Sequence, residues 1–171
     1  MTGIERLNKT SSKDAETELL ACCGSREWAQ QMSEARPFNN LTDLLRKAGQ
    51  IWWNLDVQDW LEAFASHPKI GEHKAVHNQS ERSSQWSEQE QAGVHTATSE
   101  ALVALAEANR AYKEKFGHIF IVCATGKSSE EMLMLCRQRL SHNLETEICT
   151  SAEEQRKITE IRLKKLAGVM E

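Results

Sequence analysis

A histidine fixed in front of a proline is the residue pair in this chain that most directly suggests chemistry. His67 and Pro68 stand in the stretch ASHPKIGE, where a helical pattern ends. A residue before proline is pushed out of the α region, so the preceding helix must end here. The imidazole then lies beyond a helix C-terminus and could donate or accept a proton near neutral pH. The alternative is a helix stop whose histidine only bonds the last carbonyl groups.

A second polar group follows in the stretch SEQEQ. Ser87 and Glu90 have the spacing of a capping box, which predicts a helix that begins at Ser87. Gln91 has no part in such a cap, and the N–H groups of a helix start can bind an anion. Either these residues only cap the helix, or a hydroxyl, a carboxylate and an amide converge where the loop from His67 can reach them.

Arg162 is the third candidate, because it lies within an apolar stripe. Ile158, Arg162 and Leu166 share one face of the predicted last helix. An arginine in such a stripe usually extends its charged end to solvent. The alternative is a guanidinium that binds a carboxylate or ureido group inside a pocket.

A metal site would need further ligands near His67. His73 and His77 are four residues apart, but their segment has the composition of a loop, and neither an HExxH motif nor a nearby cysteine pair accompanies them. We therefore expect no metal. The sequence also lacks a Gly-rich phosphate loop, a nucleophile elbow and a dinucleotide fingerprint, which argues against kinases, serine hydrolases and dehydrogenases.

Composition indicates a globular protein that acts on neither nucleic acid nor membranes. The 171 residues suit one domain. The formal net charge of −4 gives no excess of basic residues that would bind nucleic acid. No apolar run has transmembrane length and the N-terminus has no apolar signal core, so we expect a cytoplasmic location. Five cysteines without CxxC spacing are expected to be buried thiols in a reducing compartment.

The pattern of apolar residues predicts long helices, which only two prolines and eight glycines interrupt. Residues 67–86 show no clear periodicity and are predicted to form a loop, whereas 119–124 should be a buried extended segment that cannot make a sheet alone. The predicted fold is all-α, one domain over residues 1–171 with about seven or eight helices. The predicted helices cover 14–22, 26–35, 41–53, 56 to the His67-Pro68 pair, 87–116, 128–140 and 144–166.

Taken together, these segments resemble one known family. The chain is similar to the 2-oxo-4-hydroxy-4-carboxy-5-ureidoimidazoline (OHCU) decarboxylases of urate breakdown. The likeness covers nearly the whole chain, and HisPro followed by Ser-x-x-Glu-Gln and Phe-Gly-x-x-Phe is specific in combination. The matching stretches are LN at residues 7–8, CGSREW, RPF, HPKIGE, SEQEQAGV, ANRAYKEKFGHIFIV, TGKSSEEML and EEQRKITEIRLKKL.

The resemblance implies a helical, usually dimeric enzyme that needs no metal or organic cofactor. Its reaction is the loss of carbon dioxide from OHCU, which gives (S)-allantoin. By motif, His67 corresponds to the catalytic histidine and Glu90 to its acidic partner. The residues that correspond to substrate-binding positions are Pro68, Ser87, Gln91, Phe116, Phe120, Ile121 and Arg162.

One stretch departs from the family pattern. Members commonly have Phe-Gly-Phe-Pro-Phe where this chain has Phe-Gly-His-Ile-Phe, at residues 116–120. The backbone therefore regains an N–H at Ile119. We expect His118 to be exposed or to cap a helix; the alternative is that it contacts the site. Two other classes remain as alternatives. One is a non-enzymatic helical module whose Trp-rich first half binds a partner; the other is a metal-dependent ureido hydrolase that uses His67, His73 and His77.

Overall fold

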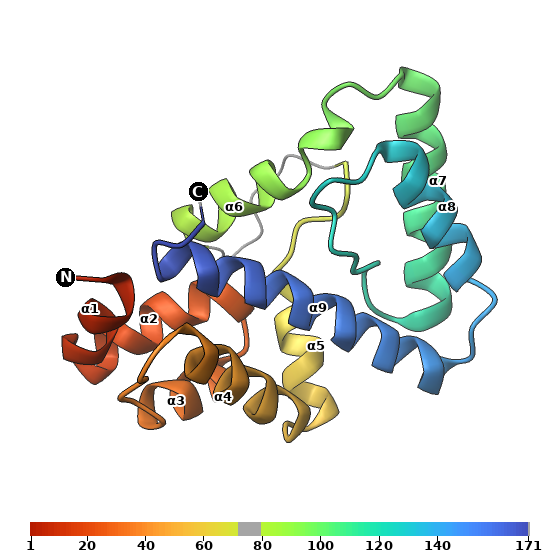
Figure 1. Ribbon diagram of the computed structural model, residues 1–171. Coiled ribbons are helices and arrows are strands. Elements are labelled where there is room, and N and C mark those ends of the chain that lie inside the picture. The colour runs from red at the N-terminus through yellow and green to blue at the C-terminus, as the bar shows by residue number, and fades with distance from the viewer. Residues whose placement is uncertain (72–79, 171) are drawn as a thin grey trace. The chain divides into compact units, whose positions relative to one another are not determined.

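The computed structural model describes residues 1–71 and 80–170, and within them the chain is all-α without a strand (Figure 1). These residues form nine α-helices and one 3₁₀ helix, close to the number predicted. No helix in these two ranges is long and apolar enough to cross a membrane. The helices are α1 Gly3–Lys9, α2 Ser12–Cys23, α3 Arg26–Glu34, α4 Leu41–Trp53, α5 Val57–Ala65, α6 Glu81–Glu90, α7 Ser99–Phe116, α8 Ser129–Arg139 and α9 Leu144–Leu166, with the 3₁₀ helix η1 at Ala92–Val94.

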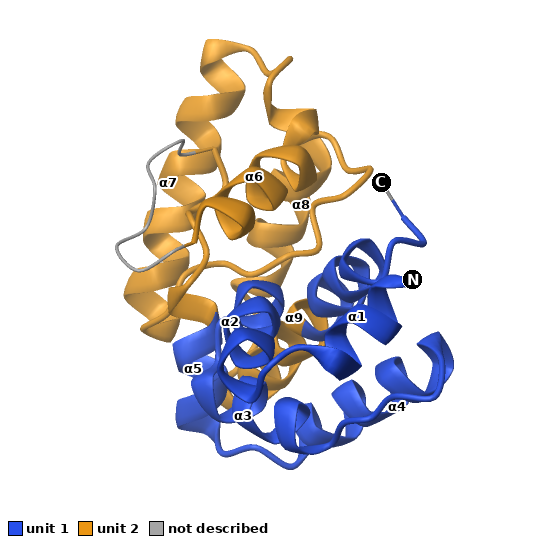
Figure 2. Ribbon diagram, turned by 90° about the vertical axis from the view of Figure 1, so that its left-hand side faces the viewer, with its two compact units in different colours: residues 1–63, 156–171 blue, residues 64–155 orange. Residues whose placement is uncertain are grey.

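The chain divides into two compact units, coloured separately in Figure 2. Unit 1 comprises Met1–Ala63 and Arg156–Glu171, and unit 2 comprises Phe64–Gln155. Helices α5 and α9 each contribute residues to both units. The expectation of one domain over residues 1–171 stays a prediction.

Unit 1 is built on α2, α3 and α4, in which α3 packs against both of the others. Its core holds Trp28, which is fully buried and whose indole N–H donates to the carbonyl of Ala48 at 3.1 Å. Gly24 ends α2 in the left-handed region, with φ of 89°, and the side chain of Ser25 caps α3. The boundary predicted between these helices is therefore confirmed.

Unit 2 has its core along α7 and α8, which pack side by side (Figure 1). The stripe predicted on the long helix is confirmed over α7, where Leu105, Ala108 and Tyr112 are buried. Met132 and Cys136 of α8 pack against this stripe. The stop predicted after Phe116 is also confirmed, because the helix ends at a left-handed glycine, residue 117.

The prediction of one helix over residues 87–116 is wrong. The structure has α6 before Gln91 and α7 after Thr98, whose side chain caps α7. Between them, in η1, Gly93 passes close to the backbone of Lys127: a Cβ on Gly93 would lie 2.1 Å from the Lys127 carbonyl oxygen. Residues 81–86, which were predicted to be loop, begin α6 under the cap of Ser80.

The extended segment at residues 119–124 is buried as predicted, except for the half-buried Ile119. It forms no strand, so side chains satisfy part of its backbone. Arg139 Nη1 donates to the carbonyl of Ile121 at 2.6 Å, and Glu154 Oε2 accepts from the N–H of Cys123 at 2.7 Å. These two side-chain contacts do for the segment what hydrogen bonds to a neighbouring strand would do in a sheet.

None of the five cysteines, all of which lie in the described residues, forms a disulfide. The expectation that all are buried is wrong for Cys149, which is exposed on α9. The other four are buried, and burial raises the pKa of Cys23 to about 12 and that of Cys136 to about 11. Thiols with such pKa values stay protonated and chemically inert at neutral pH.

Candidate functional site

His67 lies two residues beyond the end of α5, as the proline at position 68 predicted. Its backbone N–H donates to the carbonyl of Phe64 at 3.2 Å, and its side chain is buried, with 9% of its surface exposed. Ring atom Nε2 is 2.7 Å from Oε1 of Gln155 on α9. The helix stop and the buried imidazole therefore occur together: the backbone N–H of His67 bonds the helix end, and its ring contacts a side chain of another helix.

Three carboxamide side chains hold the segment of residues 67–71, which we call the HisPro segment. Gln155 of α9 contacts the His67 ring, and Asn109 Nδ2 of α7 donates to the carbonyl of Ile70 at 3.0 Å. The N–H of Gly71 donates to Oε1 of Gln91 at 3.0 Å. Gly71 has φ of +86°, a left-handed conformation that favours glycine. The segment is thus fixed to α9, α7 and the end of α6.

Ser87 and Glu90 are buried, but they lie in the last turns of α6 rather than at a helix start. The Ser87 hydroxyl donates to the Ser83 carbonyl at 2.9 Å within the helix, and Gln91 is the C-cap of α6. The capping box and the helix-start anion site proposed for these residues are therefore wrong. The error arises because Ser-x-x-Glu also occurs inside helices, where the hydroxyl bonds the preceding turn.

Aromatic residues at the end of α7 and in the segment that follows it form a cluster around Tyr112. The ring centroid of Tyr112 is 4.6 Å from the centroid of Phe116 and 5.3 Å from the centroid of Phe120. His118 joins this cluster, with its ring 5.2 Å from Phe64 and its Nδ1 donating to the carbonyl of Ile119 at 2.9 Å. The expectation that His118 is exposed or caps a helix is wrong: it is buried, and burial lowers its pKa.

Beneath this cluster lies a buried ionic network that sequence patterns did not predict. Arg139 Nε donates to Glu147 Oε1 at 2.8 Å, and the Tyr112 hydroxyl donates to the same carboxylate. His142 Nδ1 lies 2.7 Å from Glu147 Oε2. Burial raises the pKa of Glu147, but the hydrogen bonds from Arg139, Tyr112 and His142 outweigh it, so the net pKa is lowered.

The signal for the missed residues is a polar stripe on one face of α9. Glu147, Ser151 and Gln155 follow one another at intervals of four, and all three are fully buried. Residues four apart lie on the same side of a helix. Because buried polar groups need hydrogen-bond partners, a polar stripe in a core helix indicates side chains that hold other segments. Ser151 follows this rule, since its hydroxyl lies 3.0 Å from Arg139 Nη2.

Arg162 belongs to unit 1, whereas the HisPro segment, Ser87 and Glu90 belong to unit 2. The alternative in which Arg162 reaches solvent is wrong, because only 1% of the residue is exposed. Its Nη1 donates to the carbonyl of Ala21 at 3.3 Å. Its convergence with His67 stays a prediction.

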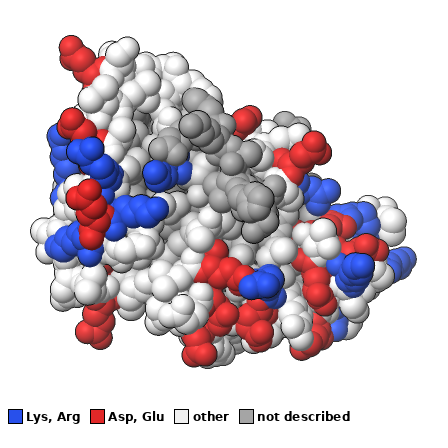
Figure 3. All heavy atoms as spheres, turned by 180° about the vertical axis from the view of Figure 1, so that it is seen from behind, with Lys and Arg blue, Asp and Glu red and all other residues white. Residues whose placement is uncertain are grey.

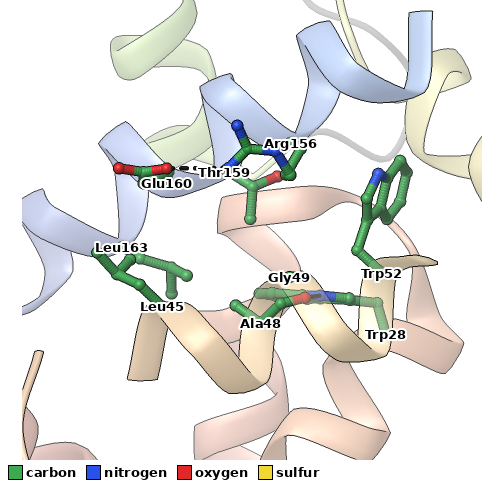
Figure 4. A pocket seen from close by; sticks show the side chains of 9 residues that line it. All are labelled: Trp28, Leu45, Ala48, Gly49, Trp52, Arg156, Thr159, Glu160 and Leu163. Carbon is green, nitrogen blue, oxygen red and sulfur yellow. Dashed lines mark hydrogen bonds and ion pairs between the residues drawn. The ribbon is translucent and has the colours of Figure 1, made fainter. Parts of the chain in front are cut away.

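The described part of unit 1 contains a small cavity between α4 and α9 (Figure 4). Its volume is about 20 Å³, which is room for roughly one water molecule. In the figure Gly49 lies on the α4 side, and the ion pair between Arg156 and Glu160, 3.1 Å, lies on the α9 side. This cavity is too small for a metabolite.

A larger groove, of about 680 Å³, lies in unit 2 between residues 69–71 and one face of α7. Lys69, Arg110 and Lys113 line it together with Glu107 and Glu114. The face of the molecule in Figure 3 likewise shows Lys and Arg among Asp and Glu rather than one charge sign. Mixed charge of this kind does not match a phosphate backbone.

No three residues among His, Cys, Asp and Glu gather as metal ligands within residues 1–71 and 80–170. The ligand pair considered above, His73 and His77, lies outside the described residues.

The structure is that of an all-α protein with a buried histidine at a helix break. Three carboxamide side chains fix the segment that contains this histidine to three helices. The family model for the OHCU decarboxylases matches residues 8–164. The chain therefore belongs to the OHCU decarboxylase family.

Curated relatives include bifunctional proteins of uric acid degradation and proteins named for OHCU decarboxylase. The uric acid degradation bifunctional protein TTL of Arabidopsis thaliana is 40% identical over 152 residues, which cover 88% of this chain and 47% of that protein. The chain thus spans about half the length of that relative, and 32% of the bifunctional protein PucL of Bacillus subtilis. A Haloferax volcanii OHCU decarboxylase is 24% identical over 161 residues, covering 94% of this chain and 91% of that one.

Solved structures share the fold. A crystal structure of an OHCU decarboxylase in the presence of (S)-allantoin has a TM-score of 0.76 and 39% identity, covering 88% of this chain and 97% of that one. A crystal structure of an (S)-allantoin synthase has a TM-score of 0.70 and covers 98% of this chain and 53% of that one. At 16% identity, the second likeness shows the fold alone.

Proposed function

We propose that this protein decarboxylates OHCU to (S)-allantoin in urate breakdown and is a carboxy-lyase. The observation that carries the proposal is the family match over residues 8–164, supported by a 39% identical structure that was solved in the presence of (S)-allantoin. We further propose that the reaction needs no metal or organic cofactor and that the enzyme is a cytoplasmic homodimer.

The chemistry defines what the site must do. The bond to the carboxylate breaks, carbon dioxide leaves, and the electron pair moves into the adjacent C=N of the ring, whose nitrogen takes up a proton. The ring hydroxyl then loses its proton to become a carbonyl, and the carbon that bears the ureido group gains a proton. Orienting the carboxylate out of the ring plane and stabilising the developing charge accelerate the first step. Protonation from one face makes the product a single enantiomer.

His67 is the residue proposed to move these protons. Its imidazole is buried at a helix break, and the HisPro segment is fixed to three helices, so its position is defined before substrate binds. An imidazole titrates near neutral pH and can therefore take the hydroxyl proton. Glu90, buried at the end of α6, is proposed as its acidic partner.

The remaining proposed roles concern substrate binding. Arg162 is proposed to bind the ureido or carbonyl groups, because holding the departing carboxylate too tightly would stabilise the ground state instead. The buried guanidinium and its bond to the Ala21 carbonyl support a fixed orientation. The other residues proposed to contact substrate are Pro68, Ser87, Gln91, Phe116, Phe120 and Ile121.

The test supplies freshly prepared OHCU and follows the optical activity of the allantoin formed, because the spontaneous reaction also yields allantoin. We expect the wild type to give the (S) enantiomer. The His67→Ala variant should be slower by about 10²–10⁴-fold, the usual contribution of a general acid or base. His95→Ala, which changes an exposed histidine, is the matched control and should keep the wild-type rate.

Unchanged optical activity with His67→Ala would refute the role of His67. If the His67→Ala, Glu90→Gln and Arg162→Met variants all behave like wild type, the helical partner-binding module becomes the better interpretation. Activity that is lost with a chelator and restored by zinc would instead support the metal-dependent ureido hydrolase.

A further inference from the structure

We propose that Gln155 is a positioning residue that fixes the tautomer of His67, with the proton on Nε2, so that Nδ1 is the nitrogen that exchanges a proton with substrate. The second half of this statement rests on the function proposed above, whereas the tautomer itself does not.

The geometry of one contact carries the proposal. Nε2 of His67 and Oε1 of Gln155 are 2.7 Å apart, and both side chains are buried, with 9% and 0% of their surfaces exposed. A carboxamide oxygen can only accept a hydrogen bond, so the ring nitrogen that faces it must carry the proton. A neutral imidazole has a single N–H, so its other nitrogen, Nδ1, must be a proton acceptor.

The position of Gln155 suits this role. It lies in the polar stripe of α9, seven residues before Arg162, and it is fully buried, so the surrounding side chains restrict its rotamer. The His67 backbone is restricted by the following proline, so a second restraint on the ring defines the side chain as well. The same logic applies to other histidines whose partner on one nitrogen decides what the other nitrogen does.

An amide at this position differs from a carboxylate in its effect on charge. A carboxylate beside an imidazole favours the imidazolium and raises its pKa, which suits an acid. An uncharged amide at Nε2 holds the ring without adding to the effect of Glu90, the carboxylate that the proposed function gives the imidazole as its acidic partner. The residue type therefore matches a base that takes a hydroxyl proton.

The tautomer is measured directly, without any activity assay, on wild-type protein with ¹⁵N-labelled histidine. The chain has six histidines, so the His67 signals are identified by their loss in His67→Asn. At a pH where the ring is neutral, we expect Nε2 in the protonated, pyrrole-like range and Nδ1 in the unprotonated range. The opposite pattern would mean that the amide is turned and donates to the ring, and it would overturn the proposal.

Two variants then separate positioning from structure. Gln155→Leu removes the acceptor and should lower kcat roughly tenfold to hundredfold, the range for lost outer partners of functional histidines, with little change in KM. Gln155→Glu keeps an acceptor and should retain the Nε2–H tautomer, while the acidic limb of the kcat/KM profile moves up by about one pH unit or more. Gln138→Leu, an exposed glutamine of α8, is the control and should match wild type.

An unchanged kcat and an unchanged His67 spectrum in a folded Gln155→Leu protein would overturn the proposal. So would a Gln155→Glu profile that coincides with the wild-type profile. If the ¹⁵N spectra show the expected tautomer but His67→Ala retains full activity, the proposed function fails while the role of Gln155 in fixing the tautomer stands. The two failures are therefore distinguishable.

Discussion

Replacing Arg139 with methionine should be among the most damaging single changes in unit 2. Arg139 is buried, with 6% of its surface exposed, and it donates to Glu147, to the Ser151 hydroxyl at 3.0 Å and to the carbonyl of Ile121 at 2.6 Å. Methionine fills a similar volume but donates no hydrogen bond. The variant therefore leaves the fully buried carboxylate of Glu147 without its main cation.

Removing one partner of a buried ion pair typically costs about 3–5 kcal/mol of the free energy of unfolding, because the other charge stays buried. For a chain of this length, each kcal/mol lowers the melting temperature by roughly 2–4 °C, so we expect a fall of about 6–20 °C. The freed carbonyl of Ile121 adds to this cost, since an unpaired buried acceptor is itself unfavourable.

Urea denaturation, followed by far-UV circular dichroism, measures the change. Arg137→Met, on the exposed face of the same helix, is the control and should stay within about 0.5 kcal/mol of wild type. The double variant Arg139→Met/Glu147→Leu should be more stable than Arg139→Met alone, because it removes the stranded carboxylate. A loss below about 1 kcal/mol for Arg139→Met, or a double variant no more stable than the single one, would refute this reasoning.

Four further changes test other parts of the structure, each by the free energy of unfolding from urea denaturation. Gly49→Ala should stabilise the protein by about 0.5–1 kcal/mol, because the residue lies inside α4 and the new Cβ would meet no atom within 4 Å. Gly117→Ala would also meet no atom within 4 Å, but the backbone φ of +79° disfavours alanine, so this change should destabilise the protein by about 1–2 kcal/mol. Gly93→Ala should destabilise by more than Gly117→Ala, because its Cβ would lie 2.1 Å from the Lys127 carbonyl oxygen. The lowered pKa of Glu147 means that its contribution to stability is complete above its ordinary value of 4.5 and is lost as the pH falls through the folded-state value. The stability difference between wild type and Glu147→Gln should therefore shrink below about pH 4.5, and a constant difference would contradict the ionised pair.

Local chemistry explains the parts of the fold that could be predicted. Gly24-Ser25 separates α2 from α3, and Ser128 with Glu131 forms the capping box that begins α8. These signals act within one turn of the chain, so the sequence contains them in full. Pro68 is of the same kind, because its effect on His67 is steric and immediate.

The parts that could not be predicted depend on contacts between distant residues. The Ser87–Glu90 spacing matches a cap, but α6 ends after it, and no local pattern shows the close approach of Gly93 to the backbone of Lys127 in the break. Gln155 is an ordinary polar residue in sequence, and only the fold places it 2.7 Å from the His67 ring. The helix α1 is a different case, since its capping box of Thr2 and Glu5 is visible in the sequence and was missed.

The three contacts that hold the HisPro segment have a consequence for how the protein responds to acid. Gln91, Asn109 and Gln155 carry amides, which keep the same charge at every pH at which a protein stays folded. When the imidazole of His67 gains or loses a proton, these anchors do not titrate with it. The ring can thus change charge on a frame whose own bonding pattern is insensitive to pH, so proton exchange need not be accompanied by movement of the chain.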